Sequence, residues 1–176
     1  AELAKGEYLM FCDHDDTLEP DALYEIVKAI NDTDADVVYT DEDKVSMDGQ
    51  HYFDPNFKPD FNLFRLRENN YICHIFVVRK SLTDETGMLR SEFDGAQDFD
   101  FILRCCEKAK KITHIPKVLY HWRCHMDSTA ADPSSKAYAY EAGRKAIREH
   151  YQRMGIDAKV DMTERPGWYR SHIKIQ

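Results

Sequence analysis

The sequence predicts an α/β fold, in which short buried strands alternate with amphipathic helices along the chain. Residues 8–12 and 37–40 are short apolar runs bounded by polar residues, a pattern typical of buried strands. Between them, residues 20–31 carry apolar side chains at helical spacing. With 176 residues, the chain is about one domain long and can bury a sizeable core.

The first predicted strand, residues 8–12, is apolar throughout, so we expect it to be fully buried. Pro20 suits the first position of the helix that follows, because the N–H that proline lacks would have no helical partner there. The apolar residues that define this helix are Leu23, Ile26, Val27 and Ile30.

The second predicted strand, residues 37–40, ends in a run of acids, Asp41, Glu42 and Asp43. We therefore expect a second strand end that carries carboxylates. Residues 46–70 are rich in Asp, Asn, Pro and aromatic residues, and predict a long ordered loop or a pair of short strands.

The second half of the chain continues the alternation. The predicted elements are a strand at 71–80, a short helix at 81–86 closed by Gly87, a helix at 96–111, one or two strands at 111–123 with Pro116 at a bend or edge, and a last helix from Pro133 to Met154, capped by Asp132 and stopped by Gly155.

Composition excludes several classes of protein. The formal net charge of −8 argues against a nucleic-acid binder, because a phosphate backbone requires a basic surface. The five cysteines show no zinc-site spacing, so we expect reduced, mostly buried thiols in a cytoplasmic protein. No apolar run approaches the length of a membrane span. The start of the sequence resembles the end of a helix that stops at Gly6, so we expect a fragment of a longer chain.

The residues after the first strand form an acidic cluster, Asp13, Asp15 and Asp16. Such a cluster is self-repelling at neutral pH unless a cation lies in it, and carboxylate oxygens are preferred ligands of Mg²⁺ and Mn²⁺. The alternative explanation is a turn, in which Asp is common. A turn needs only one or two such residues, so the cluster favours a metal site.

Two further segments contain candidate functional residues. Asp98 lies in the first turn of its predicted helix but on the apolar face, where a carboxylate is costly unless it faces a cleft. It could accept a proton from a substrate hydroxyl, whereas Asp100 is expected to pair with the helix dipole. His121 and Arg123 share one face of a strand, with His125 beyond its end. A structural role is the alternative for each histidine.

Several sequence blocks resemble the family 2 glycosyltransferases of the GT-A fold, in the branch that includes rhamnan and O-antigen enzymes. The blocks are CDHDDTLEPDALYEI, VVYTDEDK, FKPDF, NYICHIFVVRKSL, GAQDFDFILRC and HIPKVLYHWRCHMDSTA. They extend from about Gly6 to Ala130 and occur in the order of the family pattern. The resemblance implies a GT-A-type sheet flanked by helices, here lacking the N-terminal nucleotide-binding half.

The resemblance also implies roles for individual residues. Asp13 and Asp15, with Asp16 as a third, would hold Mn²⁺ or Mg²⁺ against the diphosphate of a sugar donor, and His125 would reach the same site. Asp98 would be the catalytic base. The substrate-binding residues would be Gln97, which stands where many members have Glu, together with Asp41, Asp43, His121, Trp122 and Arg123.

The implied function is inverting, metal-dependent transfer of a sugar from a nucleotide-diphosphate donor to a glycan hydroxyl. Residues 1–130 would form the metal- and acceptor-side half of the catalytic domain, and residues 131–176 its C-terminal helix and tail. The expected partners are the donor, the acceptor and the remainder of the same catalytic domain, in the cytoplasm or at the inner face of the membrane. As a fragment, the chain is expected to be poorly active alone.

Two alternatives stay open from the sequence. Asp13, Asp15 and Thr17 also resemble the first motif of haloacid-dehalogenase-type phosphatases, although Asp16 stands where that family usually has Gly. The chain could instead be a non-catalytic carbohydrate-binding module.

Overall fold

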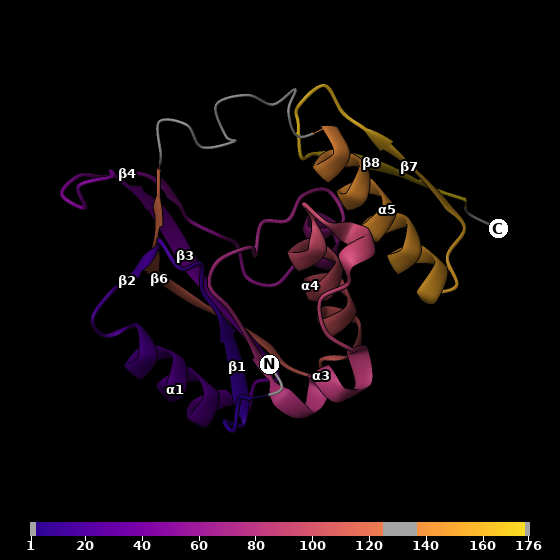
Figure 1. The fold of residues 1–176 in the computed structure, drawn as a ribbon. Coiled ribbons are helices and arrows are strands. Elements are labelled where there is room, and N and C mark those ends of the chain that lie inside the picture. Colours follow the sequence, from indigo (N-terminus) through magenta and orange to yellow (C-terminus); the bar gives the residue numbers. More distant parts are fainter. Residues whose placement is uncertain (1–2, 125–136, 175–176) are drawn as a thin grey trace.

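The computed structural model describes residues 3–124 and 137–174. In these residues a six-stranded mixed sheet has helices on both faces, and a two-stranded hairpin follows near the C-terminus (Figure 1). The strands are β1 (Tyr8–Phe11), β2 (Thr17–Leu18), β3 (Val37–Val45), β4 (Tyr52–Asn56), β5 (Phe76–Arg79), β6 (Ile112–Arg123), β7 (Ala158–Met162) and β8 (Tyr169–Ile173). The helices are α1 (Ala22–Thr33), α2 (Leu63–Leu66), α3 (Lys80–Thr86), the 3-10 turn η1 (Ser91–Phe93), α4 (Gln97–Lys108) and α5 (Ala137–Arg153).

Strand β3 organises the larger sheet, whose order is β1-β5-β3-β6-β2. It pairs in parallel with β6 and antiparallel with β5 and β4. Strands β1 and β2 are consecutive in the sequence but stand at opposite ends of this order. The loop between them must therefore cross one end of the sheet, and this loop carries the acidic cluster.

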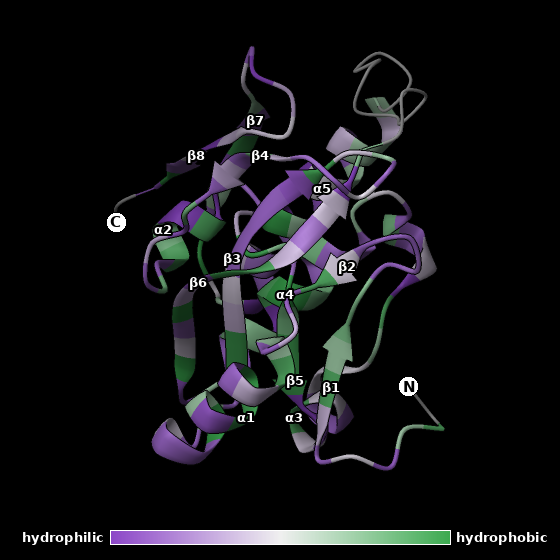
Figure 2. Cartoon of the chain, turned by 90° about the vertical axis from the view of Figure 1, so that its left-hand side faces the viewer, coloured by the Kyte–Doolittle hydropathy of each residue, from purple (hydrophilic) through white to green (hydrophobic). Residues whose placement is uncertain are grey.

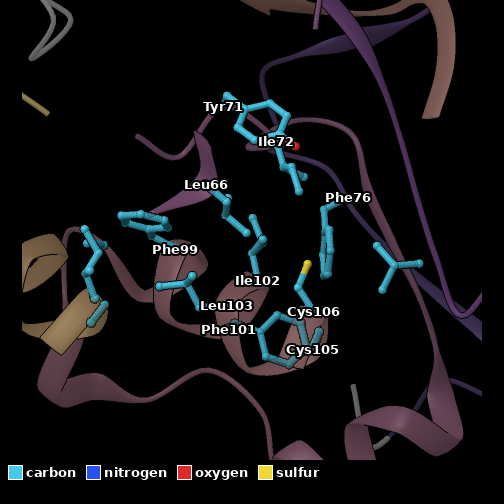
Figure 3. Packing of buried hydrophobic residues seen from close by; sticks show 14 of the residues in the cluster. Leu66, Tyr71, Ile72, Phe76, Phe99, Phe101, Ile102, Leu103, Cys105 and Cys106 are labelled. Carbon is cyan, nitrogen blue, oxygen red and sulfur yellow. The ribbon is translucent and has the colours of Figure 1, made fainter. Parts of the chain in front are cut away.

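Two apolar clusters cover the two faces of the sheet. Helix α1 packs on one face through Ala22 and Ile26, which join buried residues of β3, β5 and β6. Helices α3, α4 and α5 lie on the other face (Figure 1), where α4 supplies Phe101, Ile102 and Leu103 to the larger cluster. Figure 3 shows these α4 side chains in one cluster with Phe76 of β5, whose ring centroid lies 5.9 Å from that of Phe101. The fold is thus α/β with the sheet between helical layers, as the sequence predicts.

The prediction that the first strand is fully buried is wrong. Only Leu9 of β1 is buried, and Cys12 beyond the strand is exposed. The reason is that β1 is an edge strand in the part of the chain that the structure describes, so one side of it has no neighbouring strand. All five cysteines are free, but only Cys105 and Cys106, in α4, are buried, so the expectation of mostly buried thiols is wrong.

The prediction of a second acidic strand end is also wrong. Strand β3 continues to Val45, so Asp41 and Asp43 lie inside the strand. Pairing with β6 along this whole length stabilises the polar residues in extended form. Figure 2 shows that this upper end of β3, with β4, is hydrophilic, whereas β1 and β5 are largely hydrophobic.

The C-terminal elements pack against the rest of the molecule. Ala146, Ile147 and Tyr151 of α5 and Val160 and Tyr169 of the β7–β8 hairpin join the larger apolar cluster. The predicted helix start at Pro133 and its cap at Asp132 lie outside the described residues. No helix among the described residues is long and apolar enough to cross a membrane.

Candidate active site

A group of potential metal ligands lies where the β1–β2 loop crosses the sheet. Oxygens of Asp13 and Asp16 and a ring nitrogen of His74 all lie within 4.8 Å of one another. Asp13 is exposed, and the other two residues are half-buried. The two carboxylate oxygens are donors that suit Mn²⁺ or Mg²⁺, whereas the imidazole nitrogen is a donor more often found on softer divalent metals. We call these three residues the metal-side group.

Strand β6 fixes the position of the loop. The phenol of the buried Tyr120 donates to Asp16 and accepts a hydrogen bond from the backbone N–H of Asp13 at 3.3 Å. Asp16 also accepts from the backbone N–H of Arg123 at 2.8 Å. Burial, together with the neighbouring Asp16 carboxylate, raises the pKa of Tyr120 well above its usual value, so the phenol stays a hydrogen-bond donor.

His74 was not expected from the sequence. It lies just before β5, and its ring stacks on that of Tyr120 with centroids 4.9 Å apart and planes 8° apart. Its backbone carbonyl accepts a hydrogen bond from the buried ammonium of Lys58. The available sequence signal was a histidine inside an otherwise apolar run, residues 71–78, but that position alone does not reveal which acids it meets.

The two other predicted metal ligands are Asp15 and His125. Asp15 is not part of the metal-side group; its carboxylate lies 3.8 Å from His14 Nδ1. Its backbone carbonyl accepts a hydrogen bond from Arg123 Nε at 2.7 Å. His125 lies outside the described residues.

Asp98 stands in the first turn of α4 and is half-buried. Asn70 Nδ2 donates to its Oδ2 at 2.8 Å, and the Cys73 thiol lies 3.8 Å from the same oxygen. Burial and then Asp98 raise the pKa of Cys73 well above its usual value, so this thiol is neutral. Among the described residues, no Lys, Arg or His forms an ion pair with Asp98. The carboxylate is therefore held in place without a neutralising cation in this part of the chain.

Asp100, two residues further along, is in a different environment. It is fully buried and accepts hydrogen bonds from Arg90 and Arg104. Burial alone would raise the pKa of Asp100, but the two guanidinium groups outweigh it and hold the pKa below its usual value. From the first turn of α4, where an interaction with the helix dipole is expected, it also forms buried ion pairs with both arginines.

Two predicted substrate-binding residues pair with histidines of β6. Asp41 is buried, and its Oδ1 accepts a hydrogen bond from the backbone N–H of Lys58 at 2.9 Å. Nε2 of His114 lies 2.8 Å from the same oxygen. Asp43 lies 2.6 Å from Nδ1 of the buried His121, which also approaches Glu19 at 3.2 Å. Asp41 and His121 are therefore enclosed by protein groups.

A cleft of about 430 Å³ lies between β3, β4 and β6 on one side and α2 and the β7–β8 turn on the other. Asp43 and Trp122 line it, and Trp122 is 37% exposed. Arg123 does not line it; its guanidinium donates to the carbonyls of Ser46 and Met47 instead. Gln97 accepts from the backbone N–H of Gly95 at 2.7 Å, at the start of α4.

Comparison with known proteins identifies the family. Residues 1–87 match the model of Glycosyl transferase family 2. The chain is 47% identical over 174 residues to the protein y4gI of Sinorhizobium fredii, and 38% identical over 173 residues to the O-antigen biosynthesis protein RfbC of Myxococcus xanthus. These matches cover 97% and 98% of this chain, but 19% and 13% of the relatives, so the chain spans less than a fifth of either protein.

The fold is shared with a solved structure, that of Staphylococcus aureus TarS residues 1–349 in complex with UDP-GlcNAc. The TM-score is 0.60 at 19% identity, over 85% of this chain and 44% of that one. This likeness confirms the GT-A fold that the sequence resemblance implies, and the family match confirms the resemblance itself. Residues 1–87 of the chain thus belong to glycosyl transferase family 2, a family of enzymes.

Proposed function

We propose that this chain forms the part of an inverting glycosyltransferase that holds the diphosphate of a nucleotide-sugar donor and activates an acceptor hydroxyl. The observation that carries the proposal is the environment of Asp98, a half-buried carboxylate whose described partners are the neutral groups of Asn70 and Cys73. The segment that supplies these partners continues directly into His74 of the metal-side group. Base and metal ligands are thus connected by one short stretch of chain.

Asp13, Asp16 and His74 would hold Mn²⁺ or Mg²⁺, because their donor atoms converge and two of them are carboxylate oxygens. When bound, such a cation neutralises charge that develops on the departing diphosphate. Tyr120 and the backbone of Arg123 keep Asp16 in place by hydrogen bonds, and stacking on Tyr120 keeps the imidazole of His74 in place.

Asp98 would accept the proton of the acceptor hydroxyl as the oxygen of that group forms a bond to the anomeric carbon. The bond from the anomeric carbon to the diphosphate oxygen breaks on the opposite face, and the nucleotide diphosphate leaves with the electron pair. Attack opposite the leaving group inverts the anomeric centre. A positioned base contributes about 10²–10⁴-fold to such a rate.

The proposed partners are a nucleotide-diphosphate sugar, a polysaccharide-type acceptor and the remaining part of the same catalytic domain. RfbC is an O-antigen biosynthesis protein and TarS was crystallised with UDP-GlcNAc, which supports these substrate classes for this chain. The free thiols support a reducing compartment such as the cytoplasm.

The test is release of nucleotide diphosphate by the complete enzyme that contains this chain, with a panel of nucleotide sugars and Mn²⁺. We expect release that depends on acceptor and metal. Hydrolysis of an aryl phosphate that Asp13→Asn abolishes would favour the phosphatase alternative instead, against the family match. Saccharide binding without turnover of any donor would favour the non-catalytic module.

A further inference from the structure

The cleft beside Trp122 has two chemically different walls. One wall consists of β3 and β4 residues with acidic groups, and the other of α2 and the turn between β7 and β8 with two arginines. The residues on which the argument depends are Glu42, Asp43 and Asp54 on the first wall and Arg65, Arg165 and Trp168 on the second.

Each acid of the first wall already has a protein partner. Glu42 lies 3.0 Å from the buried ammonium of Lys58. Asp43 lies 2.6 Å from the imidazole of His121, and Asp54 pairs with Lys44. Lysine ammonium groups thus pair with Glu42 and Asp54, and a contact with His121 holds Asp43, so each of the three acids is engaged within the protein.

The arginines of the second wall are compensated far less. The guanidinium groups of Arg65 and Arg165 lie over the ring of Trp168, at 4.3 and 4.6 Å from its centroid. The described ion pair of Arg65 is a 3.9 Å contact with Glu68, and Arg165 is exposed. A guanidinium stacked on an aromatic ring keeps its N–H groups for in-plane hydrogen bonds, which suit a carboxylate or phosphate. The cationic groups of the cleft that are most available to a ligand are consequently these two guanidinium groups.

The β7–β8 turn that carries Arg165 and Trp168 is fixed to the end of α2. Asn69 Nδ2 donates to the carbonyl of Gly167 at 2.9 Å, and the backbone N–H of Tyr169 donates to the carbonyl of Glu68 at 2.8 Å. Gly167 has φ of +75°, which favours glycine. The arginine wall is thus preorganised rather than a chance arrangement of long side chains.

Trp122 connects this cleft to the metal-side group. Its indole lines the cleft, and its centroid lies 6.2 Å from the ring of His74. An exposed aromatic ring next to polar groups is a suitable surface for the apolar face of a sugar ring. A saccharide in the cleft would therefore lie next to the proposed reaction centre.

We propose that this cleft binds an anionic sugar residue of the acceptor, with the sugar ring against Trp122 and its carboxylate or phosphate on Arg65 and Arg165. The identification of the ligand as the acceptor rests on the proposed function. The binding of an anionic sugar does not rest on it, since such binding requires neither donor nor metal.

The experiment uses the intrinsic fluorescence of the chain, because its two tryptophans, Trp122 and Trp168, both line the cleft. Digalacturonic acid is titrated in the presence of a chelator, and its dimethyl ester serves as the uncharged counterpart with the same rings. Glucose 6-phosphate is compared with glucose to test phosphate as the source of charge. We expect a saturable fluorescence change with at least one of the two anions, and about tenfold weaker binding of its neutral counterpart.

Arg165→Met should weaken binding of the responding anion about tenfold, and Arg165→Lys should restore only part of the loss because lysine lacks the planar fork. Arg170→Met is the matched control, since Arg170 is exposed on the same hairpin but does not line the cleft. It should change affinity less than about twofold. Circular dichroism checks that each variant is folded.

Equal binding of both anions and their neutral counterparts, no binding of either anion, or unchanged affinity in folded Arg165→Met would each overturn the proposal. These outcomes leave nucleotide diphosphate release by the complete enzyme untouched. Conversely, saturable anion binding in an enzyme that releases no nucleotide would refute the proposed transferase activity and retain the cleft as an anionic saccharide site.

Discussion

Three histidines near the larger sheet, His74, His114 and His121, each lie beside two carboxylates, but in two different arrangements. His114 and His121 have one carboxylate at each ring nitrogen: Asp41 and Asp60 for His114, at 2.8 and 3.3 Å, and Asp43 and Glu19 for His121, at 2.6 and 3.2 Å. Each of these rings bridges two acids that lie on opposite sides of it. Both imidazoles are buried, with their two nitrogens in use.

His74 lies beside Asp13 and Asp16 in the other arrangement. Here the ring stacks on Tyr120, and one nitrogen and the two carboxylates converge on a common region. The same residue types therefore have different roles, depending on whether the carboxylates lie on opposite sides of the imidazole ring or converge with one of its nitrogens. Bridging satisfies the acids within the protein, whereas convergence leaves them repelling one another until a cation enters.

Helix α4 repeats this contrast within a single turn. Asp100 is buried between two arginines, and Asp98 is half-buried against the neutral groups of Asn70 and Cys73. Neutralised acids contribute to stability, and acids without a described cation partner remain able to accept a proton. Four predictions test this distinction between acids with a cationic partner and acids without a described one, in order of decreasing effect.

Asp100→Asn should lower the free energy of unfolding by about 3–5 kcal/mol, because it leaves the buried Arg104 guanidinium without its carboxylate. Urea denaturation of the chain at pH 7 measures this. A loss below about 1 kcal/mol would mean that Asp100 does not stabilise the fold through its arginines.

Asp98→Asn should instead leave stability nearly intact and lower turnover of the complete enzyme about 10²-fold or more, with donor affinity preserved. Asparagine keeps the size of the side chain and loses the proton acceptor. Asp94→Asn, an exposed acid in the preceding turn, is the control and should stay within about twofold of wild type. Near-normal turnover in a folded Asp98→Asn enzyme would leave the base unidentified.

His74→Ala should weaken Mn²⁺ binding about tenfold, equivalent to about 1.4 kcal/mol, because it removes the nitrogen donor of the metal-side group. Calorimetric titration of the complete enzyme with Mn²⁺ provides the measurement without turnover. His14→Ala removes a neighbouring histidine that is outside the group and should have little effect. Equal Mn²⁺ affinity in both variants would exclude His74 as a ligand.

A smaller effect should appear in the pH dependence of stability. The pKa of Asp100 is lowered in the folded state because the guanidinium groups of Arg90 and Arg104 outweigh burial. Its stabilising contribution is thus complete above its unfolded pKa, about 4, and is lost as pH falls through the lower folded value. The stability difference between wild type and Asp100→Asn should stay constant from pH 7 to about 5 and shrink below about pH 4. A difference that grows on acidification would contradict this assignment.

Much of the fold follows from local patterns. The apolar runs locate β1 and β3, and helical spacing locates α1 and α4 to within about three residues at either end. Local pattern does not find β2, a strand of two residues that exists because it pairs with β6. The β7–β8 hairpin was missed too, and it contributes the arginine wall of the cleft.

The sequence by itself determined the family, the acidic cluster and the candidate base, since these are properties of residue type and order. The metal and base roles remain predictions. Only the tertiary structure decided that His74 joins Asp13 and Asp16, whereas Asp41 pairs with His114. The physical reason is sheet order: β1 and β2 are sequence neighbours at opposite edges, so their loop crosses above a residue just before β5 and residues of β6, about 60 and 105 positions away. Strand pairing at such separations sets which side chains meet, and no local pattern encodes it.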